Sequence, residues 1–315
     1  MAEGPLVLCP IDFSAASSAA LLCAVDIVQR FDARLMLLTV DDPMLADAAR
    51  VRMGEGWHRV NSERELRAFL GDALGPAAVS RHPPQVEVAE GKPALEILRV
   101  ARESACDLMV MSTQGRSGSS KLVFGSTAER VLRETTVPVL VVPAKGAGPA
   151  SVDAASRSGA PVLVPVDFSS ATPRQTDIAR RIASALNLPI LLLHVIEPLH
   201  VPVPAVIDLS GLLATRLSQA QAELNACGQD TPAPIRWETM IEAGNAAEEI
   251  ARVAREQPAA LVVMGLHGPP APGPRMGSVT YGVLQRAPVL TLALPPSSAS
   301  MAELLLRLRK GGKPS

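Results

Sequence analysis

The sequence predicts an α/β protein built from two tandem domains. Three observations support this: four sequence blocks recur in the same order in both halves, short apolar runs alternate with helix-like patterns, and those runs are apolar throughout. Fully apolar runs are typical of parallel strands buried on both faces, and alternation with helices is typical of a doubly wound sheet. We therefore expect two flavodoxin-like or Rossmann-like domains, each a five-stranded parallel sheet with helices on both faces.

The repeat is the strongest of these observations. The matched blocks are LVLCPIDFS and VLVPVDFS at 6–14 and 162–169, then 90–103 with 243–256, 107–115 with 260–268, and 124–142 with 276–293. Four blocks in one order indicate a duplicated domain rather than a shared helix composition.

The boundaries follow from the repeat. The run 144–160 is rich in Ala, Gly and Ser and has no hydrophobic periodicity, which is typical of a linker. We expect a first domain at 1–145, a linker at 146–160, a second domain at 161–297 and a C-terminal tail at 298–315. The tail has the pattern of a short amphipathic helix, which favours packing back on the domain over contact with a membrane surface or a partner.

Within the domains, apolar runs and helical periodicity predict the individual elements. In the first half, strands are expected near 6–11, 34–40, 85–89, 107–112 and 138–142, and helices near 15–31, 59–74, 93–104 and 126–135. In the second half, strands are expected near 162–166, 189–195, 235–241, 260–264 and 288–293, with helices between them.

Composition and charge exclude several classes of protein. The 30 Lys and Arg nearly balance the 31 Asp and Glu, which gives no basic footprint for nucleic acid. No run of eighteen apolar residues appears, so stable membrane insertion is not expected. Without a signal-peptide pattern, and with four widely spaced cysteines, the chain is expected to be cytoplasmic and free of disulfides.

The loop STQGRSGSSKLVFGST at 112–127 is the most informative stretch for function. Its glycines let the backbone approach a ligand closely, and serine hydroxyls with helix N-terminal amides suit an anion. Arg116 and Lys121 add positive charge, so the loop predicts a phosphate site. The alternative is a polar surface loop before a helix capped by the Ser126 or Thr127 hydroxyl. The loop is neither a Walker A motif nor a GxGxxG fingerprint.

With these residues in view, both halves resemble universal stress proteins. ATP-binding members of that family carry a glycine, two residues, a second glycine, nine residues, then glycine and serine or threonine. Here Gly115 is followed by nine residues and then Gly125-Ser126, while Ser112 stands where the first glycine would be. The family's Pro-x-Asp at the end of the first strand is Pro10-Ile11-Asp12.

The resemblance implies a nucleotide site in the first domain. Asp12 and Val40 would hold the nucleoside, with Val40 facing the adenine, and Gly115, Gly125, Ser126 and Thr127 would hold phosphates. The full candidate set is Pro10, Asp12, Val40, Met111, Ser112, Gly115, Arg116, Gly125, Ser126 and Thr127. ATP is the expected ligand, and Mg²⁺ would accompany it through its phosphates. The resemblance also implies pairing of the domains through the last strands, 138–142 and 288–292, and leaves further assembly into a homodimer open.

The second half predicts a weaker copy of the same site. Its candidates are Pro165, Asp167, Val195, Gly265, Gly268, Gly277 and Ser278. Only eight residues, 269–276, separate Gly268 from Gly277, and prolines stand at 269, 270, 272 and 274. Proline lacks a backbone N–H, so each proline removes one donor from a loop that would bind phosphate through its amides. A degenerate site is therefore expected here.

Other polar residues have plainer alternatives. Asp12 and Asp167 could each cap the following helix, although Ser14 and Ser169 compete for that role. His194 is expected to be a packed histidine of a strand. His267 lies in the proline-rich loop, and no spacing of His, Cys or acidic residues completes a metal site.

Taken together, the sequence predicts a stress-response regulatory protein that binds ATP mainly in its N-terminal domain. No nucleophile, general base or metal cluster stands out, so the chain is expected not to be an enzyme, or at most to be a slow ATPase. The alternative is a nucleotide-free interaction scaffold, or a pseudo-dimer that binds an apolar ligand. Ser112, the prolines of the second loop and the apolar run 198–210 motivate that alternative.

Overall fold

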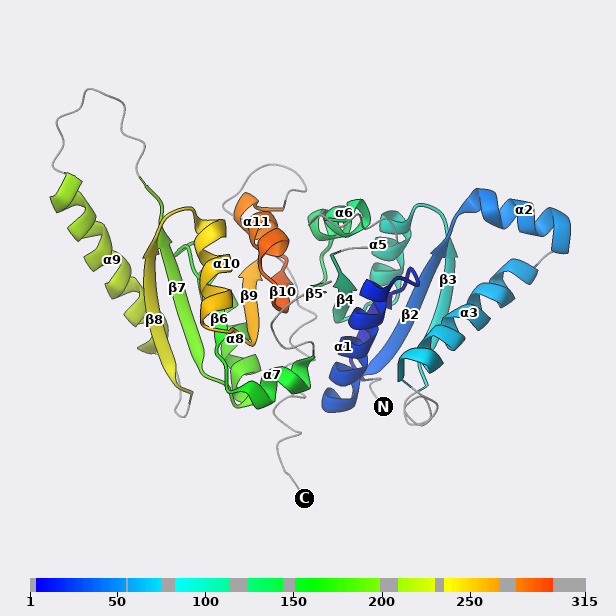
Figure 1. The fold of residues 1–315 in the computed structure, drawn as a ribbon, viewed down its shortest axis with the longest axis horizontal. Coiled ribbons are helices and arrows are strands. Elements are labelled where there is room, and N and C mark those ends of the chain that lie inside the picture. The colour runs from blue at the N-terminus through cyan, green and yellow to red at the C-terminus, as the bar shows by residue number, and fades with distance from the viewer. Residues whose placement is uncertain are drawn as a thin grey trace, which may run out of the picture.

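One ten-stranded sheet runs through both halves of the chain (Figure 1). The computed structural model describes residues 4–54, 56–74, 83–113, 124–143, 151–198, 209–229, 235–266 and 276–296. The strands are β1 Leu6–Pro10, β2 Arg34–Asp41, β3 Gln85–Glu90, β4 Leu108–Ser112, β5 Val139–Val142, β6 Val162–Pro165, β7 Ile190–Ile196, β8 Trp237–Ala243, β9 Leu261–Gly265 and β10 Thr291–Leu294.

The strand order is β3-β2-β1-β4-β5-β10-β9-β6-β7-β8. Within each half all neighbouring strands are parallel, and the order 3-2-1-4-5 is that of a Rossmann-type sheet. The predicted fold class, two five-stranded parallel sheets with helices on both faces, is confirmed. Each predicted strand is present, with ends shifted by at most three residues.

The two halves are joined edge to edge at the centre of the molecule. β5 and β10 pair antiparallel, with Leu140 opposite Leu292 and Val139 opposite Ala293. Both strands are buried along their whole length. The junction therefore buries two short apolar strands that would otherwise be sheet edges with unpaired backbone groups.

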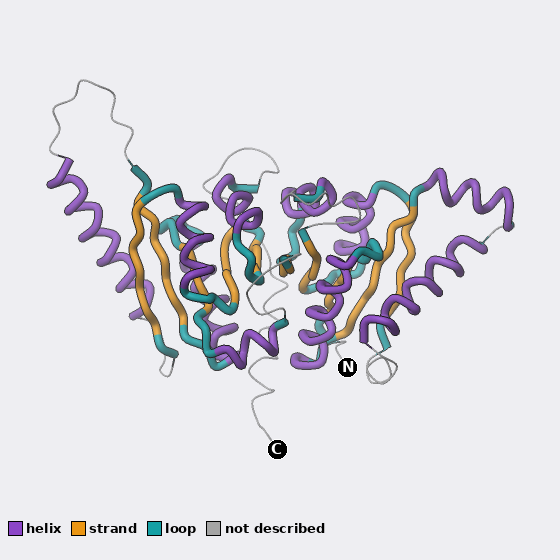
Figure 2. The backbone as a smooth tube through the Cα atoms, in the orientation of Figure 1, coloured by secondary structure: helices purple, strands orange, loops and turns teal. Residues whose placement is uncertain are grey.

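Helices cover both faces of this sheet (Figure 2). Their bounds are α1 Ala15–Phe31, α2 Pro43–Met53, α3 Trp57–Leu74, α5 Pro93–Glu103, α6 Ser126–Glu134, α7 Val152–Ser158, α8 Thr172–Leu186, α9 Leu209–Gln229, α10 Ala246–Glu256 and α11 Ser278–Arg286. Side chains of α1, α3, α8 and α9 share one continuous core that spans both halves. On the other face, α5 with α6 and α10 with α11 cover two separate cores.

The segment between the domains contains a helix that the sequence did not predict. α7 begins after Ser151, whose hydroxyl accepts from the Ala154 amide, and ends at Gly159 in the left-handed conformation. It is docked on α1, because the Asp153 amide donates to the Asp26 carboxylate at 2.6 Å. The helix has seven residues, too short to show hydrophobic periodicity, which is why the sequence pattern did not predict it within the segment 146–160.

α2 is a second helix that the sequence pattern missed. Its Ala46 is buried, whereas Met44, Leu45 and Val51 are 81%, 68% and 90% exposed. Such a helix has no inward apolar stripe for a periodicity search to find. Its start signal was nevertheless present, since Asp42 caps the helix by accepting from the Met44 amide and Pro43 occupies the first turn.

The repeat extends to details of backbone conformation. Gly91 and Gly244 follow β3 and β8 with φ of +150° and +151°, and their amides donate to carbonyls at the ends of β2 and β7. A side chain at either glycine would be strained. Phe13 with Phe168, and Asp32 with Asn187, likewise form pairs with positive φ. The duplicated halves thus keep the same turns as well as the same strands.

Among the described residues, no helix combines the length and the apolar character needed to span a bilayer.

The close packing of α10 on α11 yields a stability prediction. A Cβ added at Gly282 would lie 2.6 Å from the Ala247 Cβ, whereas a Cβ at Gly71 in α3 would meet nothing within 4 Å. Gly282→Ala should destabilise the fold by roughly 1–2 kcal/mol, because overpacking outweighs the gain in helix propensity. Gly71→Ala should stabilise by about 0.5–1 kcal/mol. Urea unfolding midpoints measure both, and a raised midpoint for Gly282→Ala would contradict the packing.

Candidate functional site at the carboxyl edge of the sheet

The predicted site residues gather at the carboxyl edge of the parallel strands in each half. Strand order reverses between β1 and β4 in the first domain and between β6 and β9 in the second. Each of these strand pairs is in register at only two positions before the strands diverge. A crevice outside the carboxyl ends at such a point is where open α/β sheets bind ligands.

In the first domain, Asp12 lies two residues after the end of β1 and is half-buried. Its Oδ1 accepts from the Ser14 amide at 3.1 Å and from the Ser14 hydroxyl at 2.6 Å. Ser14, in turn, caps α1 by accepting from the Ser17 amide. Ser14 is thus the cap of α1, and Asp12 holds the turn that leads into it.

The end of the predicted phosphate loop is built by a backbone contact. The Gly125 amide donates to the Thr113 carbonyl at 2.8 Å, which closes the loop at its base. Gly125 is the N-cap of α6 and supplies no side-chain hydrogen bond, while Ser126 and Thr127 are already helical. The expected hydroxyl cap from Ser126 or Thr127 was therefore wrong, because the helix begins at Ser126 and both residues lie inside its first turn. Gly115 and Arg116 lie outside the described residues.

The remaining described candidates of the first domain lie at or near the carboxyl ends of its strands. Pro10, Val40 and Ser112 are half-buried at the ends of β1, β2 and β4. Met111 instead belongs to the core beneath α5 and α6, where it is 6% exposed. Its counterpart Met264 in β9 is 4% exposed and lines the cavity of the second domain, so burial of this kind is compatible with a place at the site.

The second domain repeats the loop closure although its loop is one residue shorter. The Gly277 amide donates to the Leu266 carbonyl at 2.8 Å, and Gly277 is the N-cap of α11, again with no side-chain hydrogen bond. Gly268 lies outside the described residues. The second loop is thus one residue shorter than the first, and it keeps the same hydrogen bond at its base.

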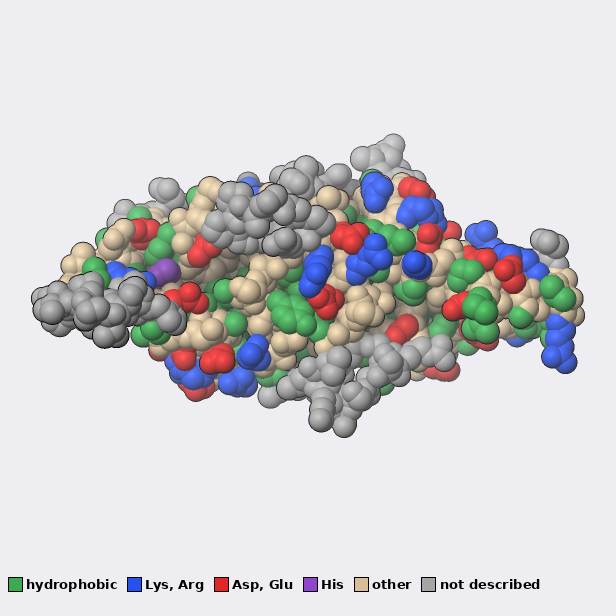
Figure 3. Space-filling view, turned by 90° about the horizontal axis from the view of Figure 1, so that it is seen from above, with side chains coloured by type: hydrophobic (Ala, Val, Ile, Leu, Met, Phe, Trp, Pro, Cys, Tyr) green, Lys and Arg blue, Asp and Glu red, His purple; other side chains and the backbone are tan. Residues whose placement is uncertain are grey.

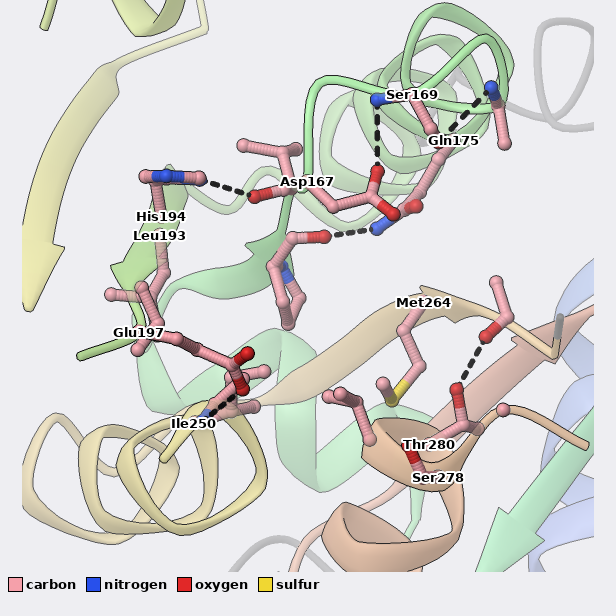
Figure 4. A pocket seen from close by; sticks show the side chains of 18 of the residues that line it. Asp167, Ser169, Gln175, Leu193, His194, Glu197, Ile250, Met264, Ser278 and Thr280 are labelled. Carbon is pink, nitrogen blue, oxygen red and sulfur yellow. Dashed lines mark hydrogen bonds between the residues drawn. The ribbon is translucent and has the colours of Figure 1, made fainter. Parts of the chain in front are cut away.

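A cavity of about 420 Å³ lies at this edge of the second domain (Figure 4). Six of the seven weaker candidates line it: Pro165, Asp167, Val195, Gly265, Gly277 and Ser278. Sequence reasoning missed other lining residues, which include Ser169, Gln175, Leu193, Glu197, Arg216, Ile250, Met264 and Thr280. These follow no motif, although Glu197 directly follows β7 as Asp42 directly follows β2.

The polar side chains of the cavity are held by backbone groups. His194 places Nδ1 2.8 Å from the Val166 carbonyl and stacks on Phe168 at a ring distance of 4.4 Å. The prediction that His194 is a packed, satisfied histidine is confirmed. Thr280 donates to the Gly265 carbonyl at 2.7 Å, and Asp167 accepts from the Ser169 amide at 3.0 Å (Figure 4). Asp167 therefore holds the same turn as Asp12.

At the outer side of the first domain, α3 is fastened to the end of β2. The Ser62 hydroxyl donates to the Asp41 carboxylate at 2.7 Å, and His58 Nε2 lies 2.7 Å from the same oxygen. Sequence reasoning did not single out this contact, although an acidic pair after an apolar strand is a visible signal. This contact holds α3 against the end of β2, next to Val40.

The described residues offer no nucleophilic thiol or metal cluster at these edges. Cys9, Cys23 and Cys106 are buried and all four cysteines are free, as predicted. Burial raises the pKa of Cys23 and of Cys106 to about 12, so both remain protonated at neutral pH. Within the described ranges, no three His, Cys, Asp or Glu side chains gather closely enough to hold a metal ion.

Comparison with known proteins assigns the family. The family model described as "Universal stress protein family" matches residues 6–143 and 160–295. A universal stress protein of Methanocaldococcus jannaschii is 30% identical over 138 residues, 43% of this chain and 80% of its own. Universal stress protein YxiE of Bacillus subtilis is 30% identical over 143 residues, 43% of this chain and 97% of its own.

Solved structures show the same fold over both halves. A universal stress protein from Archaeoglobus fulgidus matches 93% of this chain and 98% of its own, with a TM-score of 0.59 and 20% identity. One from Pseudomonas aeruginosa matches 98% of each chain, with a TM-score of 0.60 and 17% identity. Since the family model matches both repeats, the chain belongs to the universal stress protein family and carries two of its domains in tandem.

Proposed function

We propose that this chain is a stress-response regulatory protein that binds an adenine nucleotide, ATP above all, mainly in its first domain. The observation that carries the proposal is the closed loop base at Gly125, next to the crevice between β1 and β4. There the N-cap residue of α6 makes no side-chain hydrogen bond, and the N-terminal amides of a helix are donors that suit a phosphate.

The residues around this crevice fit a nucleotide. Asp12 presents a carboxylate at the end of β1 for hydroxyl or amine donors, and Val40 offers an apolar contact at the end of β2. Gly115, Gly125, Ser126 and Thr127 would hold the phosphates, with Arg116 nearby in sequence. Mg²⁺ would be held by the phosphates, since the described residues gather no acidic cluster for it.

The second domain is the weaker site in this proposal. Its cavity keeps Asp167 and Val195 in the corresponding places, but four prolines stand in the preceding loop sequence and remove amide donors.

Asp12 gives the sharpest test, because Asp167 is its matched control. Asp12→Ala should weaken ATP binding at least tenfold, since the nucleoside loses a charged partner. Asp167→Ala breaks the same turn in the second domain and should leave the affinity within about twofold of the wild-type value. Isothermal titration calorimetry with Mg-ATP measures both. Absence of binding by the wild-type protein at millimolar ATP would remove the proposed function.

A second prediction concerns turnover. We expect the site to hold bound ATP intact, because the Ser14 hydroxyl that is paired with the Asp12 carboxylate is engaged as the N-cap of α1, and the described residues supply no nucleophilic thiol or metal cluster. We expect ATP hydrolysis to be far slower than the ~1 s⁻¹ at the low end of ordinary enzymes. Release of phosphate from saturating ATP measures the rate, with Asp12→Ala as the control. A rate above that limit, lost in the variant, would show that the protein is an enzyme.

A nucleotide-free interaction scaffold is the second candidate, and α2 favours it. Met44, Leu45 and Val51 expose apolar surface at the outer end of the first domain, where hydrophobic side chains mix with charged ones (Figure 3). Exposed apolar patches of this kind often mark a protein contact. A second copy of the chain is the simplest partner, which would make the protein a homodimer.

The scaffold candidate predicts a mutational effect on assembly. Val51→Glu should weaken self-association at least tenfold, because the contact would bury an unpaired charge. Gln219→Glu, on the exposed face of α9, adds the same charge elsewhere and should have no effect. Sedimentation velocity over a concentration series measures both variants. A wild-type protein that stays monomeric at all concentrations would rule out this partner.

A further inference from the structure

Gln175 occupies the crevice of the second domain where the two central strands diverge. β6 and β9 are in register at Val162 with Leu261 and at Leu163 with Val262, and not beyond. Past this point the Gln175 Nε2 donates to the Pro165 carbonyl at 2.6 Å and to the Val263 carbonyl at 2.9 Å. One side-chain amide therefore bridges both strands and uses its two N–H groups to do so.

The direction of the Pro165 carbonyl follows from the neighbouring peptide group. The Val166 amide donates to the Leu193 carbonyl on β7 at 2.8 Å. In a trans peptide the N–H and the C=O point in opposite directions, so the Pro165 carbonyl points away from β7 and toward β9. Without a donor in the crevice, this carbonyl would lose its partner at a cost.

The first domain has the same backbone but lacks the bridge. The Ile11 amide donates to the Leu38 carbonyl on β2 at 2.7 Å, so the Pro10 carbonyl points toward β4 by the same reasoning. Phe13 and Asp32 flank α1 with positive φ, and Phe168 and Asn187 flank α8 in the same way. The number of residues from Phe13 to Phe168 equals the number from Asp32 to Asn187. With the same spacing, Ala20 in α1 corresponds to Gln175 in α8. Ala20 has no polar group and cannot bridge the strands.

The two side chains differ in their relation to the edge. Gln175 is 8% exposed and lines the floor of the cavity, close to Asp167 (Figure 4). Ala20 is fully buried and belongs to the core shared by α1 and α8. The second domain thus supplies its own side-chain donor to these carbonyls, whereas α1 supplies none from the corresponding position of the first domain.

We propose that this position determines which domain accepts the nucleotide: Gln175 occupies the carbonyls of Pro165 and Val263 at the edge of the second domain, whereas Ala20 has no polar group and leaves the corresponding Pro10 carbonyl to a hydroxyl group of a ligand's sugar. The inference rests on the proposed nucleotide site of the first domain. Gln175 is then a specificity-determining residue, because its side-chain amide already donates the hydrogen bonds that the hydroxyl groups of a ligand's sugar would otherwise donate.

The exchange of the two residues tests this inference. Ala20→Gln should lower the affinity for Mg-ATP at least tenfold in calorimetry, with the fold verified by circular dichroism and by the urea midpoint. A folded Ala20→Gln variant with wild-type affinity would overturn the proposal. If the wild-type protein itself binds no ATP, the proposed function fails, and the second-domain experiment still tests the role of Gln175.

The second-domain experiment seeks a gain of binding, which a structural defect cannot produce. Adenosine is the probe, because it needs no phosphate loop. In a background of Asp12→Ala, which removes the first site, Gln175→Ala should raise adenosine affinity at least tenfold over the background protein. Asp167→Ala added to that variant should abolish the gain. Unchanged adenosine binding by a folded Gln175→Ala variant would overturn the proposal.

Discussion

The antiparallel pairing of β5 with β10 is the contact on which the architecture depends. Each strand has four residues and is buried at every position, so a lone domain would expose a short apolar edge with unpaired backbone groups. Pairing satisfies those groups and lets Leu266, Leu284 and Ala293 of the second half complete the core beneath α5 and α6. The two domains therefore share one sheet and part of one core, and α7 fastens the segment between them to α1.

The junction also places the two loop bases near each other. Phe124 directly precedes Gly125 and lies 5.6 Å, ring to ring, from Tyr281 of α11. α11 begins at the base of the second loop and its first residues line the cavity. Phe124 is 7% exposed, so the end of the first loop is anchored in the second domain. Each site thus has one wall whose position depends on the other half of the chain.

Most of the fold was predictable, because its elements bury continuous apolar runs or regular apolar stripes. α5 and α10 show such stripes, and the limits predicted for α5, 93–104, agree closely with Pro93–Glu103. α2 escaped because its apolar side chains face solvent, and α7 because it is too short for periodicity. For the candidate site, the repeat located Asp12, Asp167 and both glycines of the loop bases. Gln175 was not predictable, since a helical glutamine reads as an ordinary surface residue until its strand contacts are known.

The missed glutamine shows how a duplicated fold can separate two sites. The hydrogen bonds of Ile11 and Val166 to the neighbouring strands fix the direction of the carbonyls of Pro10 and Pro165, so sheet pairing imposes that geometry on both halves alike. One side chain on the following helix determines which group donates a hydrogen bond to those carbonyls. Strand pairing in the sheet does not constrain that side chain. A single substitution there can change which ligand a crevice accepts while leaving strand order, loop base and core unaltered. The backbone is thus shared by necessity, whereas the chemistry at the switch point is free to diverge between the domains.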